Sequence, residues 1–192
     1  GVDLRLHTTA DAALLAGFDE VVLATGIVPR AVEFPGADHP NVVNYLDVLQ
    51  GRVQAADQVA IIGAGGIGFD VGEFLVHAGV STALDPARWM AEWGVDPQFE
   101  TRGALRKPQP EAPARTVWLL QRSAGRPGAR LGKTTGWMHR ATLKAKGVTM
   151  LGGVEYLGMD DAGLRIRVDG AEQLLPVGTV VVCAGQEPRR DL

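Results

Sequence analysis

The sequence has very little cysteine, with Cys183 alone among 192 residues. One cysteine cannot close an internal disulfide, form a dithiol redox pair or hold an iron–sulfur cluster unaided, and this usage is typical of cytoplasmic proteins. We therefore expect a cytoplasmic location. Histidines are also few and do not share the spacing of metal ligands, so no metal site is expected. They are His7, His39, His77 and His139.

Long apolar runs and an excess of positive charge are missing as well. No apolar stretch approaches membrane-spanning length and no secretory signal opens the chain, so we expect no membrane partner. The net charge of −3 offers no electrostatic footprint for nucleic acid. The composition, 46% hydrophobic and 21% charged, is that of one large or two small globular domains. The chain begins at Gly1, without Met, in what looks like a strand at residues 3–7, which indicates a piece of a longer protein. Another strand is expected at residues 18–24.

The most informative motif is a glycine-rich turn after the apolar residues 59–62. In the Gly-x-Gly-x-x-Gly pattern the first glycine permits a tight turn, the second lets a pyrophosphate approach bare backbone, and the third lets helix and strand pack closely. Apolar residues continue at helical spacing to residue 78. The motif predicts a Rossmann-like α/β domain whose helix N-terminus binds the phosphates of a dinucleotide; the alternative is a purely structural turn. The residues concerned are Gly63, Ala64, Gly65, Gly66, Ile67 and Gly68.

The end of the second predicted strand, residues 116–121, bears on the choice of cofactor. NAD-specific domains place Asp or Glu there to bind the ribose hydroxyls. This chain has Gln121, Arg122 and Ser123 instead. A guanidinium forms charge-assisted, bidentate bonds to a 2′-phosphate, which a carboxylate would repel. The sequence therefore predicts a preference for NADPH.

The loop that follows adds positive charge. Lys133 can contribute to the field around a 2′-phosphate, whereas Arg126 and Arg130 are more simply explained as solvated surface charges. Residues 128–134 imitate the phosphate-binding loop of nucleotide hydrolases, but three residues separate the glycines where four are needed, so ATP or GTP hydrolysis is not expected. Beyond it the pattern predicts a helix, a further strand and an antiparallel β-meander, at residues 137–145, 148–151 and 154–175.

Two similar segments lie near the ends of the chain. Residues 21–30 and 180–189 match at five of ten aligned positions, and each is an apolar strand followed by Gly-x-x-Pro. One interpretation is two core strands with similar turns. The alternative is that they are the outgoing and returning connections of a domain, residues 31–179, inserted in a larger one. Within it, the 37-residue segment 79–115 precedes the second strand and contains one expected helix, around residues 89–93.

The sequence resembles, nearly end to end, the C-terminal pyridine-nucleotide region of bacterial NADPH-dependent 2,4-dienoyl-CoA reductases. These are relatives of trimethylamine dehydrogenase within the Old Yellow Enzyme group. The most distinctive matches are residues 131–137, Leu-Gly-Lys-Thr-Thr-Gly-Trp, and the long insert before the second strand. A generic Rossmann domain has neither. Further matches lie at residues 24–30, 45–49, 65–70, 92–94, 119–122 and 183–188.

The resemblance implies a flavoprotein of the type with two dinucleotide-binding domains. In that family an N-terminal barrel holds FMN, an iron–sulfur cluster and the catalytic acids, and the C-terminal part holds FAD and NADPH. Residues 1–30 and 180–192 would then belong to the FAD-binding domain and residues 31–179 would be the inserted NADPH-binding domain. Small residues that let backbone approach the flavin would be Ala24, Thr25, Gly26, Ala184 and Gly185.

The function implied is electron input, from NADPH to FAD, for the reduction of an unsaturated fatty acyl-CoA in fatty-acid β-oxidation. The partner would be the remainder of the same polypeptide. We expect no catalytic residue here, and therefore no activity from these residues alone. A domain that holds ADP without turnover, as in the trimethylamine dehydrogenase branch, is the alternative, and Arg122 argues against it. A free-standing NADP-dependent dehydrogenase would need its own proton donor, and no Ser/Tyr/Lys or His/Asp pairing at a recognisable spacing is present.

Overall fold

The computed structural model describes residues 1–190 and divides the chain into two compact units. Residues 29–186 form the central unit. Residues 1–28 and 187–190 form the terminal unit. No helix in the described part of the chain is both long and apolar enough to cross a membrane.

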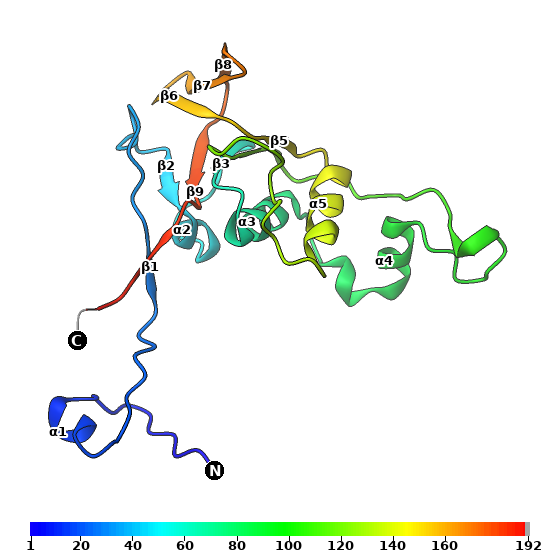
Figure 1. Ribbon diagram of the computed structural model, residues 1–192. Coiled ribbons are helices and arrows are strands. Elements are labelled where there is room, and N and C mark those ends of the chain that lie inside the picture. The colour runs from blue at the N-terminus through cyan, green and yellow to red at the C-terminus, as the bar shows by residue number, and fades with distance from the viewer. Residues whose placement is uncertain (191–192) are drawn as a thin grey trace. The chain divides into compact units, whose positions relative to one another are not determined.

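A parallel five-stranded sheet forms the middle of the central unit (Figure 1). The pairing of Ile62 with both Leu120 and Val182 brings the ends of three strands to one level. In open α/β sheets, ligands bind outside this carboxyl edge. The strands, in spatial order, are β2 (Val42–Asn44), β9 (Thr179–Val182), β3 (Gln58–Ile62), β4 (Thr116–Leu120) and β5 (Thr149–Leu151).

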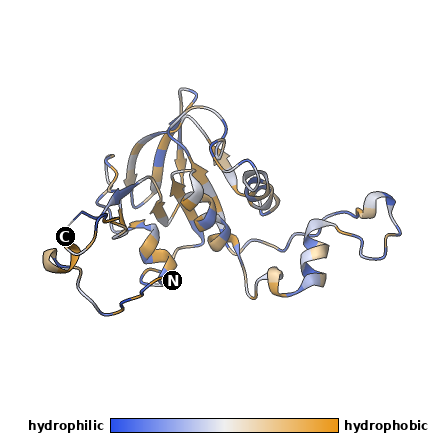
Figure 2. Cartoon of the chain, turned by 60° about the horizontal axis from the view of Figure 1, so that its bottom comes forward, coloured by the Kyte–Doolittle hydropathy of each residue, from blue (hydrophilic) through white to orange (hydrophobic). Residues whose placement is uncertain are grey.

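Alternate side chains of β3 point to opposite faces of the sheet, and both faces are covered. Val59 and Ile61 are buried in a cluster with helical residues, whereas Ala60 and Ile62 are buried in a second cluster with the meander. Figure 1 shows the helices and the meander on opposite sides of the sheet, and Figure 2 shows apolar residues concentrated in its strands. The helices are α2 (Tyr45–Leu49), α3 (Gly66–Val76) and α5 (Gly136–Ala145). The meander comprises β6 (Glu155–Asp160), β7 (Gly163–Val168) and β8 (Ala171–Leu175).

These three layers confirm the predicted fold class, a Rossmann-like α/β domain with a parallel sheet and a β-meander. The predicted second strand is β4, the predicted helix is α5, and the meander strands lie where the alternating pattern placed them. The turn between β7 and β8 has positive φ at both Asp169 (50°) and Gly170 (81°). A tight hairpin with the twist of its flanking strands requires this conformation, and Asp-Gly supplies it readily.

The segment of residues 79–115 is an insert between α3 and β4 with short elements of its own. They are η1 (Thr82–Leu84), α4 (Pro86–Trp93) and η2 (Arg102–Ala104). The carboxylate of Asp85 caps the first turn of α4, and Gly94 ends the helix with φ 70°. The helix expected around residues 89–93 is therefore confirmed; the rings of Trp89 and Trp93 pack with centroids 6.2 Å apart.

One ion pair fastens the insert to the helical layer. Nζ of Lys146, just after α5, lies 2.6 Å from Oε1 of Glu92 in α4. Thr82 also donates its hydroxyl hydrogen to Glu92 at 2.8 Å. Burial alone would raise the pKa of Glu92, but the hydrogen bonds from Lys146 and Thr82 outweigh it and hold the pKa below its ordinary value. The insert is therefore attached by a charged contact as well as by its two chain connections.

The terminal unit has little regular structure. It contains α1 (Ala12–Leu15), while β1 (Ile27–Pro29) and β10 (Gln186–Pro188) pair where the two units meet in sequence. The strands predicted at residues 3–7 and 18–24 are wrong, because neither forms in the described residues. A strand needs a neighbour to pair its backbone N–H and C=O groups, and no described segment takes that place. Their apolar side chains, including Val22 at 88% exposed, remain in solvent.

The central unit runs to residue 186 because β9, which contains Val180 and Val181, is fully buried between β2 and β3. Residues 180–186 therefore lie in the same compact unit as the glycine turn. The inserted domain at residues 31–179 and the return into an FAD-binding domain from residue 180 stay predictions. An apolar run of this length predicts a buried strand but not the sheet that the strand joins.

Candidate functional site

The glycine turn between β3 and α3 has two positions where the fold excludes any side chain. A Cβ on Gly63, whose φ is 113°, would lie 2.8 Å from the backbone carbonyl carbon of Cys183 at the end of β9. A Cβ on Gly68 would lie 1.8 Å from the carbonyl oxygen of Gly63. These two glycines allow close contact within the sheet edge and between helix and strand, as the motif predicts.

Gly65 differs from the other two because no residue in the described part of the chain fills the space beside it. It is the N-cap residue of α3, with φ −87°, and a Cβ there would meet no atom within 4 Å. No side chain of the described residues makes a capping hydrogen bond to the helix, so its first backbone N–H groups have no side-chain cap. Gly66 is equally open. A glycine that the fold does not require leaves the backbone bare toward solvent, which suits a phosphate at a helix N-terminus.

The other two residues of the turn have packing roles. Ala64 and Ile67 are half-buried and pack against the cluster on the helical side of the sheet. Neither adds a polar side chain to the site, so anion binding here would rely on backbone N–H groups and the helix dipole.

Backbone hydrogen bonds hold Gln121, Arg122 and Ser123 in place just beyond β4. Gln121 donates its N–H to the carbonyl of Leu151 at 2.8 Å and accepts from the N–H of Val154 at 3.0 Å. The carbonyl of Ser123 accepts from the N–H of Gly153 at 2.9 Å and from Nε2 of Gln121 at 3.0 Å. The side chain of Gln121 is therefore used to fix its own segment, and the exposed side chains available for recognition are those of Arg122 and Ser123.

Arg122 lies near Tyr156 of the meander. Burial raises the pKa of the Tyr156 phenol to about 12, and the charge of Arg122 acts in the opposite direction. The Tyr156 ring packs against Phe34, with centroids 5.9 Å apart. The phenol therefore stays neutral at physiological pH, so no negative charge from Tyr156 competes with a phosphate for Arg122.

The sequence reasoning missed Gly152, which shapes this part of the site. A Cβ on Gly152 would lie 2.0 Å from the carbonyl oxygen of Gly125, in the loop that carries Arg122. Only glycine at position 152, directly after β5, lets the loop pack this closely against the end of that strand. The Gly152-Gly153 pair directly after a predicted strand was the available signal, because glycine beside a strand often marks close approach of another backbone.

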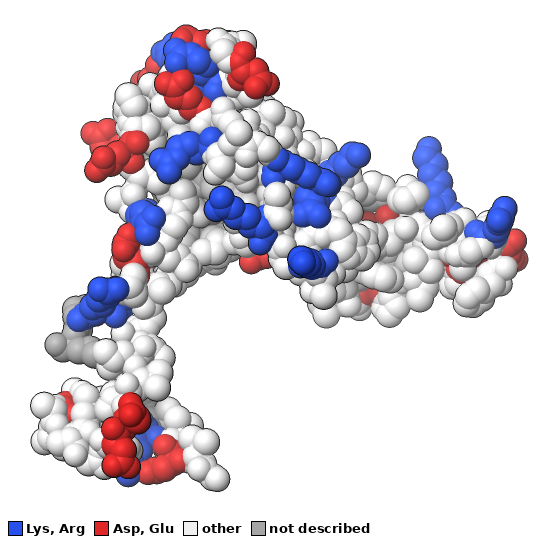
Figure 3. All heavy atoms as spheres, in the orientation of Figure 1, with Lys and Arg blue, Asp and Glu red and all other residues white. Residues whose placement is uncertain are grey.

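The remaining loop cations, including the predicted Lys133, are exposed. No ion pair engages Arg126, Arg130 or Lys133 within residues 1–190. The chain contains no Asp or Glu between Glu111 and Glu155. Figure 3 shows Lys and Arg side chains gathered over the face that carries β5 and α5. This surface is positive in a protein whose net charge is negative, and its field favours an anionic ligand.

The residues predicted to approach a flavin lie in both units. Ala184 and Gly185 follow β9, beside the glycine turn, and a Cβ on Gly185 would lie 3.1 Å from the Arg30 guanidinium. The others, Ala24, Thr25 and Gly26, belong to the terminal unit, where the hydroxyl of Thr25 donates to the carbonyl of residue 189 at 2.8 Å. Their place beside a flavin stays a prediction.

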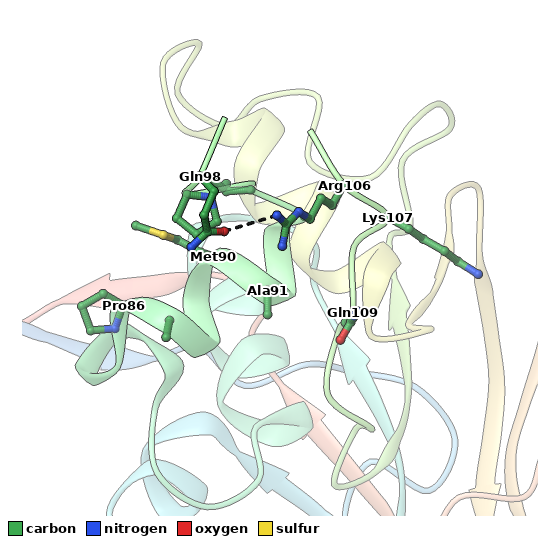
Figure 4. Close-up of a pocket in the computed structure, with 11 residues that line it drawn as sticks. Pro86, Met90, Ala91, Gln98, Arg106, Lys107 and Gln109 are labelled. Atoms are coloured by element: carbon green, nitrogen blue, oxygen red, sulfur yellow. Dashed lines mark hydrogen bonds between the residues drawn. The ribbon is translucent and has the colours of Figure 1, made fainter. Parts of the chain in front are cut away.

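A cavity of about 530 Å³ lies in the insert and does not involve the glycine turn. Its lining comes from residues 86–109, among them Met90, Gln98 and Arg106 (Figure 4). Arg106 donates to Gln98 at 3.2 Å and pairs with the fully buried carboxylate of Asp96. Its guanidinium is therefore already engaged in holding the insert together.

Comparison with known proteins gives the family. Residues 4–192 match the family model described as pyridine nucleotide-disulphide oxidoreductase. The chain belongs to this family. It is accordingly part of a flavin-dependent pyridine nucleotide oxidoreductase.

Two curated relatives are similar over different lengths. A metal reductase of Desulforamulus reducens is 27% identical over 198 residues, which cover 100% of this chain and 29% of the relative. A cinnamate reductase of Clostridium sporogenes is 37% identical over 86 residues, covering 44% of this chain and 13% of the relative. The chain thus spans less than a third of the length of either relative.

A solved structure of 2-naphthoyl-CoA reductase with 2-naphthoyl-CoA shares the fold. Its TM-score is 0.62 at 19% sequence identity, over 85% of this chain and 20% of that one.

The family name refers to disulphides, but this chain does not carry that chemistry. Cys183 is its single cysteine and is 6% exposed. Burial raises the pKa of the Cys183 thiol to about 12, so the thiolate required for disulfide exchange is scarce at neutral pH.

We predict that Cys183 resists alkylation in the folded chain. With a pKa near 12, its thiolate fraction at pH 8 is roughly a thousandfold below that of an ordinary cysteine. Iodoacetamide labelling followed by mass spectrometry should be slow at pH 8, should accelerate as the pH rises toward 12, and should be fast at pH 8 in urea. Rapid stoichiometric labelling of the folded chain at pH 8 would contradict this.

Proposed function

We propose that this chain is the NADPH-binding electron-input domain of a flavin and iron–sulfur reductase of the 2,4-dienoyl-CoA reductase type. It would present NADPH to FAD, and the electrons would go on to reduce an unsaturated acyl-CoA. The observation that carries the proposal is the pairing of two features at the ends of adjacent strands. The bare helix N-terminus at Gly65 follows β3, and the exposed Arg122 follows β4.

Two parts of the chain would recognise two different phosphate groups of NADPH. The N–H groups that begin α3 would bind the pyrophosphate, which approaches closest at Gly65. Arg122 would bind the 2′-phosphate with charge-assisted bonds, supported by the field of Lys133. When bound, NADPH supplies a hydride. The contribution of the chain is to bind and orient the dinucleotide, and no catalytic acid or base is assigned to it.

The residues fit the other cofactors only in part. Among residues 1–190, Gly63 to Gly68 is the one strand–glycine turn–helix motif, and NADPH would occupy it. For FAD the chain would offer wall residues, Ala24 to Gly26 together with Ala184 and Gly185, without a second pyrophosphate site. An iron–sulfur cluster does not fit, because Cys183 is single and buried, and the resemblance places FMN, like the cluster, in an N-terminal barrel. These groups and the rest of the FAD-binding domain would come from the remainder of the polypeptide.

The names of the relatives support an unsaturated carbon compound as the electron acceptor, but they do not determine which compound it is. The names cinnamate reductase and 2-naphthoyl-CoA reductase denote reduction of conjugated carbon compounds, whereas the metal reductase is named for a different acceptor. The electron-input half of the proposal holds for any of these acceptors. The choice of an unsaturated acyl-CoA rests on the sequence resemblance.

Titration of the 192-residue chain with NADPH, NADH and ADP tests the proposal. Binding of NADPH should be on the order of tenfold to a hundredfold tighter than that of NADH, because one charge-assisted contact contributes about 1.5–3 kcal/mol. The purified chain should also be colourless and unable to oxidise NADPH with a dye, since hydride transfer needs an acceptor held about 3–3.5 Å away.

Two kinds of result would contradict it. Equal affinities for NADPH and NADH, or ADP binding as tight as NADPH binding, would favour the alternative, a domain that holds ADP in an amine dehydrogenase. A yellow preparation with stoichiometric FAD, or steady oxidation of NADPH, would show that the flavin site lies within this chain.

A further inference from the structure

Arg140 in α5 supports the middle of the loop between β4 and α5. Its Nη1 donates to the carbonyl oxygen of Gly128 at 2.8 Å. Its Nε is buried and has no hydrogen-bond partner among residues 1–190. Burying a cationic donor without a partner is unfavourable. An arginine in this position is therefore costly as packing alone, and its one well-made contact is the one to the loop.

Gly128 is held from a second direction by α3. A Cβ on Gly128, whose φ is 73°, would lie 2.6 Å from Cζ of Phe69. Phe69 is fully buried and lies one turn after Gly65, on the helix whose N-terminus faces the phosphate site. Gly128 thus lies between Phe69 of α3 and Arg140 of α5. Neither Phe69 nor Arg140 is predicted to touch the nucleotide.

Gly128 lies in the sequence between Arg122 and Lys133, the two cations that the proposed function assigns to the 2′-phosphate. Arg122 lies six residues before Gly128 and Lys133 lies five residues after it. The loop has no helix or strand of its own, so its course depends on such contacts. Gly152 supports it near Arg122 through the close approach to Gly125, and Arg140 supports it further along.

We propose that Arg140 is a positioning residue for nucleotide selectivity. By holding Gly128 against Phe69, it fixes the loop so that Arg122 and Lys133 converge on the 2′-phosphate of NADPH. The inference rests on the proposed function, because it assumes that the loop binds this phosphate. Its distinctive consequence is that loss of Arg140 weakens NADPH binding and spares NADH, which has no 2′-phosphate.

The test compares Arg140→Met with Lys144→Met in the full chain. Lys144 is exposed and lies one turn further along α5, and its substitution by Met removes the same single positive charge. In Arg140→Met the ratio of NADPH to NADH affinity should fall by about tenfold, the equivalent of one hydrogen bond to a charged group, with NADH affinity changed by less than about twofold. Lys144→Met should keep the ratio. Hydrogen exchange in residues 122–133 should rise only in Arg140→Met, and Arg140→Lys should restore part of the ratio.

The outcomes separate this inference from the proposed function. A lower melting temperature in Arg140→Met with an unchanged ratio, or an equal loss for both nucleotides, would overturn the positioning role. If Arg140→Met does not fold, Gly128→Ala displaces the same loop from the Phe69 side and should also lower the ratio; a retained ratio would overturn the inference. Equal affinities in the unmutated chain would overturn the NADPH assignment and, with it, this inference.

Discussion

Gly65→Val is expected to abolish dinucleotide binding while the chain stays folded. The backbone at Gly65 has φ −87° and ψ −171°, a region that valine readily adopts. Among residues 1–190, apart from its chain neighbours, no atom lies within 4 Å of the new Cβ. The side chain would fill the space where the pyrophosphate meets the helix N-terminus. Losing two or more hydrogen bonds to a charged group, at about 1.5–3 kcal/mol each, should lower affinity by more than about a hundredfold.

Gly68→Ala provides the matched control within the same motif. Its Cβ would lie 1.8 Å from the carbonyl oxygen of Gly63, so helix and strand would have to separate. Such overpacking typically costs about 1–3 kcal/mol of folding stability. Urea unfolding should therefore show a loss of stability for Gly68→Ala and little change for Gly65→Val, whereas calorimetric titration should show loss of binding in Gly65→Val. A folded Gly65→Val variant that binds NADPH normally would mean that the phosphate site lies elsewhere.

Arg122→Ala is expected to remove most of the preference for NADPH over NADH. The guanidinium is exposed and follows β4 at the edge where ligands bind, so its loss should spare the fold and act on the 2′-phosphate contact. NADPH affinity should fall by about tenfold to a hundredfold, with NADH affinity nearly unchanged. Fluorescence titration of both nucleotides measures the ratio directly.

Arg102→Ala is the control for a general charge effect. Arg102 is exposed and lies in the insert. Its substitution by Ala removes one positive charge and leaves the residues that follow β4 unchanged. It should leave the nucleotide ratio unchanged. If Arg122→Ala retains the full preference, another cation of the loop must recognise the 2′-phosphate, and Lys133→Ala would be the next variant to measure.

The roles of the glycine turn could be predicted from sequence because they are local. Gly63, Gly65 and Gly68 are separated by a few residues, and their spacing alone implies a turn, a bare helix N-terminus and a close helix–strand contact. The alternating pattern of the meander was equally informative, since strands joined by short turns pair with their sequence neighbours. The apolar pattern of residues 18–24 was not sufficient to predict a strand, because a strand also needs a pairing partner that the described residues do not provide.

The sequence alone thus determined the α/β class, the glycine turn and Arg122 as the candidate for the 2′-phosphate. Only the tertiary structure decided that β9 lies between β2 and β3 and that Gly152 seats the Arg122 loop. It alone also showed that Arg140 holds Gly128. These contacts join residues far apart in the chain, or depend on how a loop without regular structure is packed. Their physical cause is the close packing of three layers, which no local pattern of residue types contains.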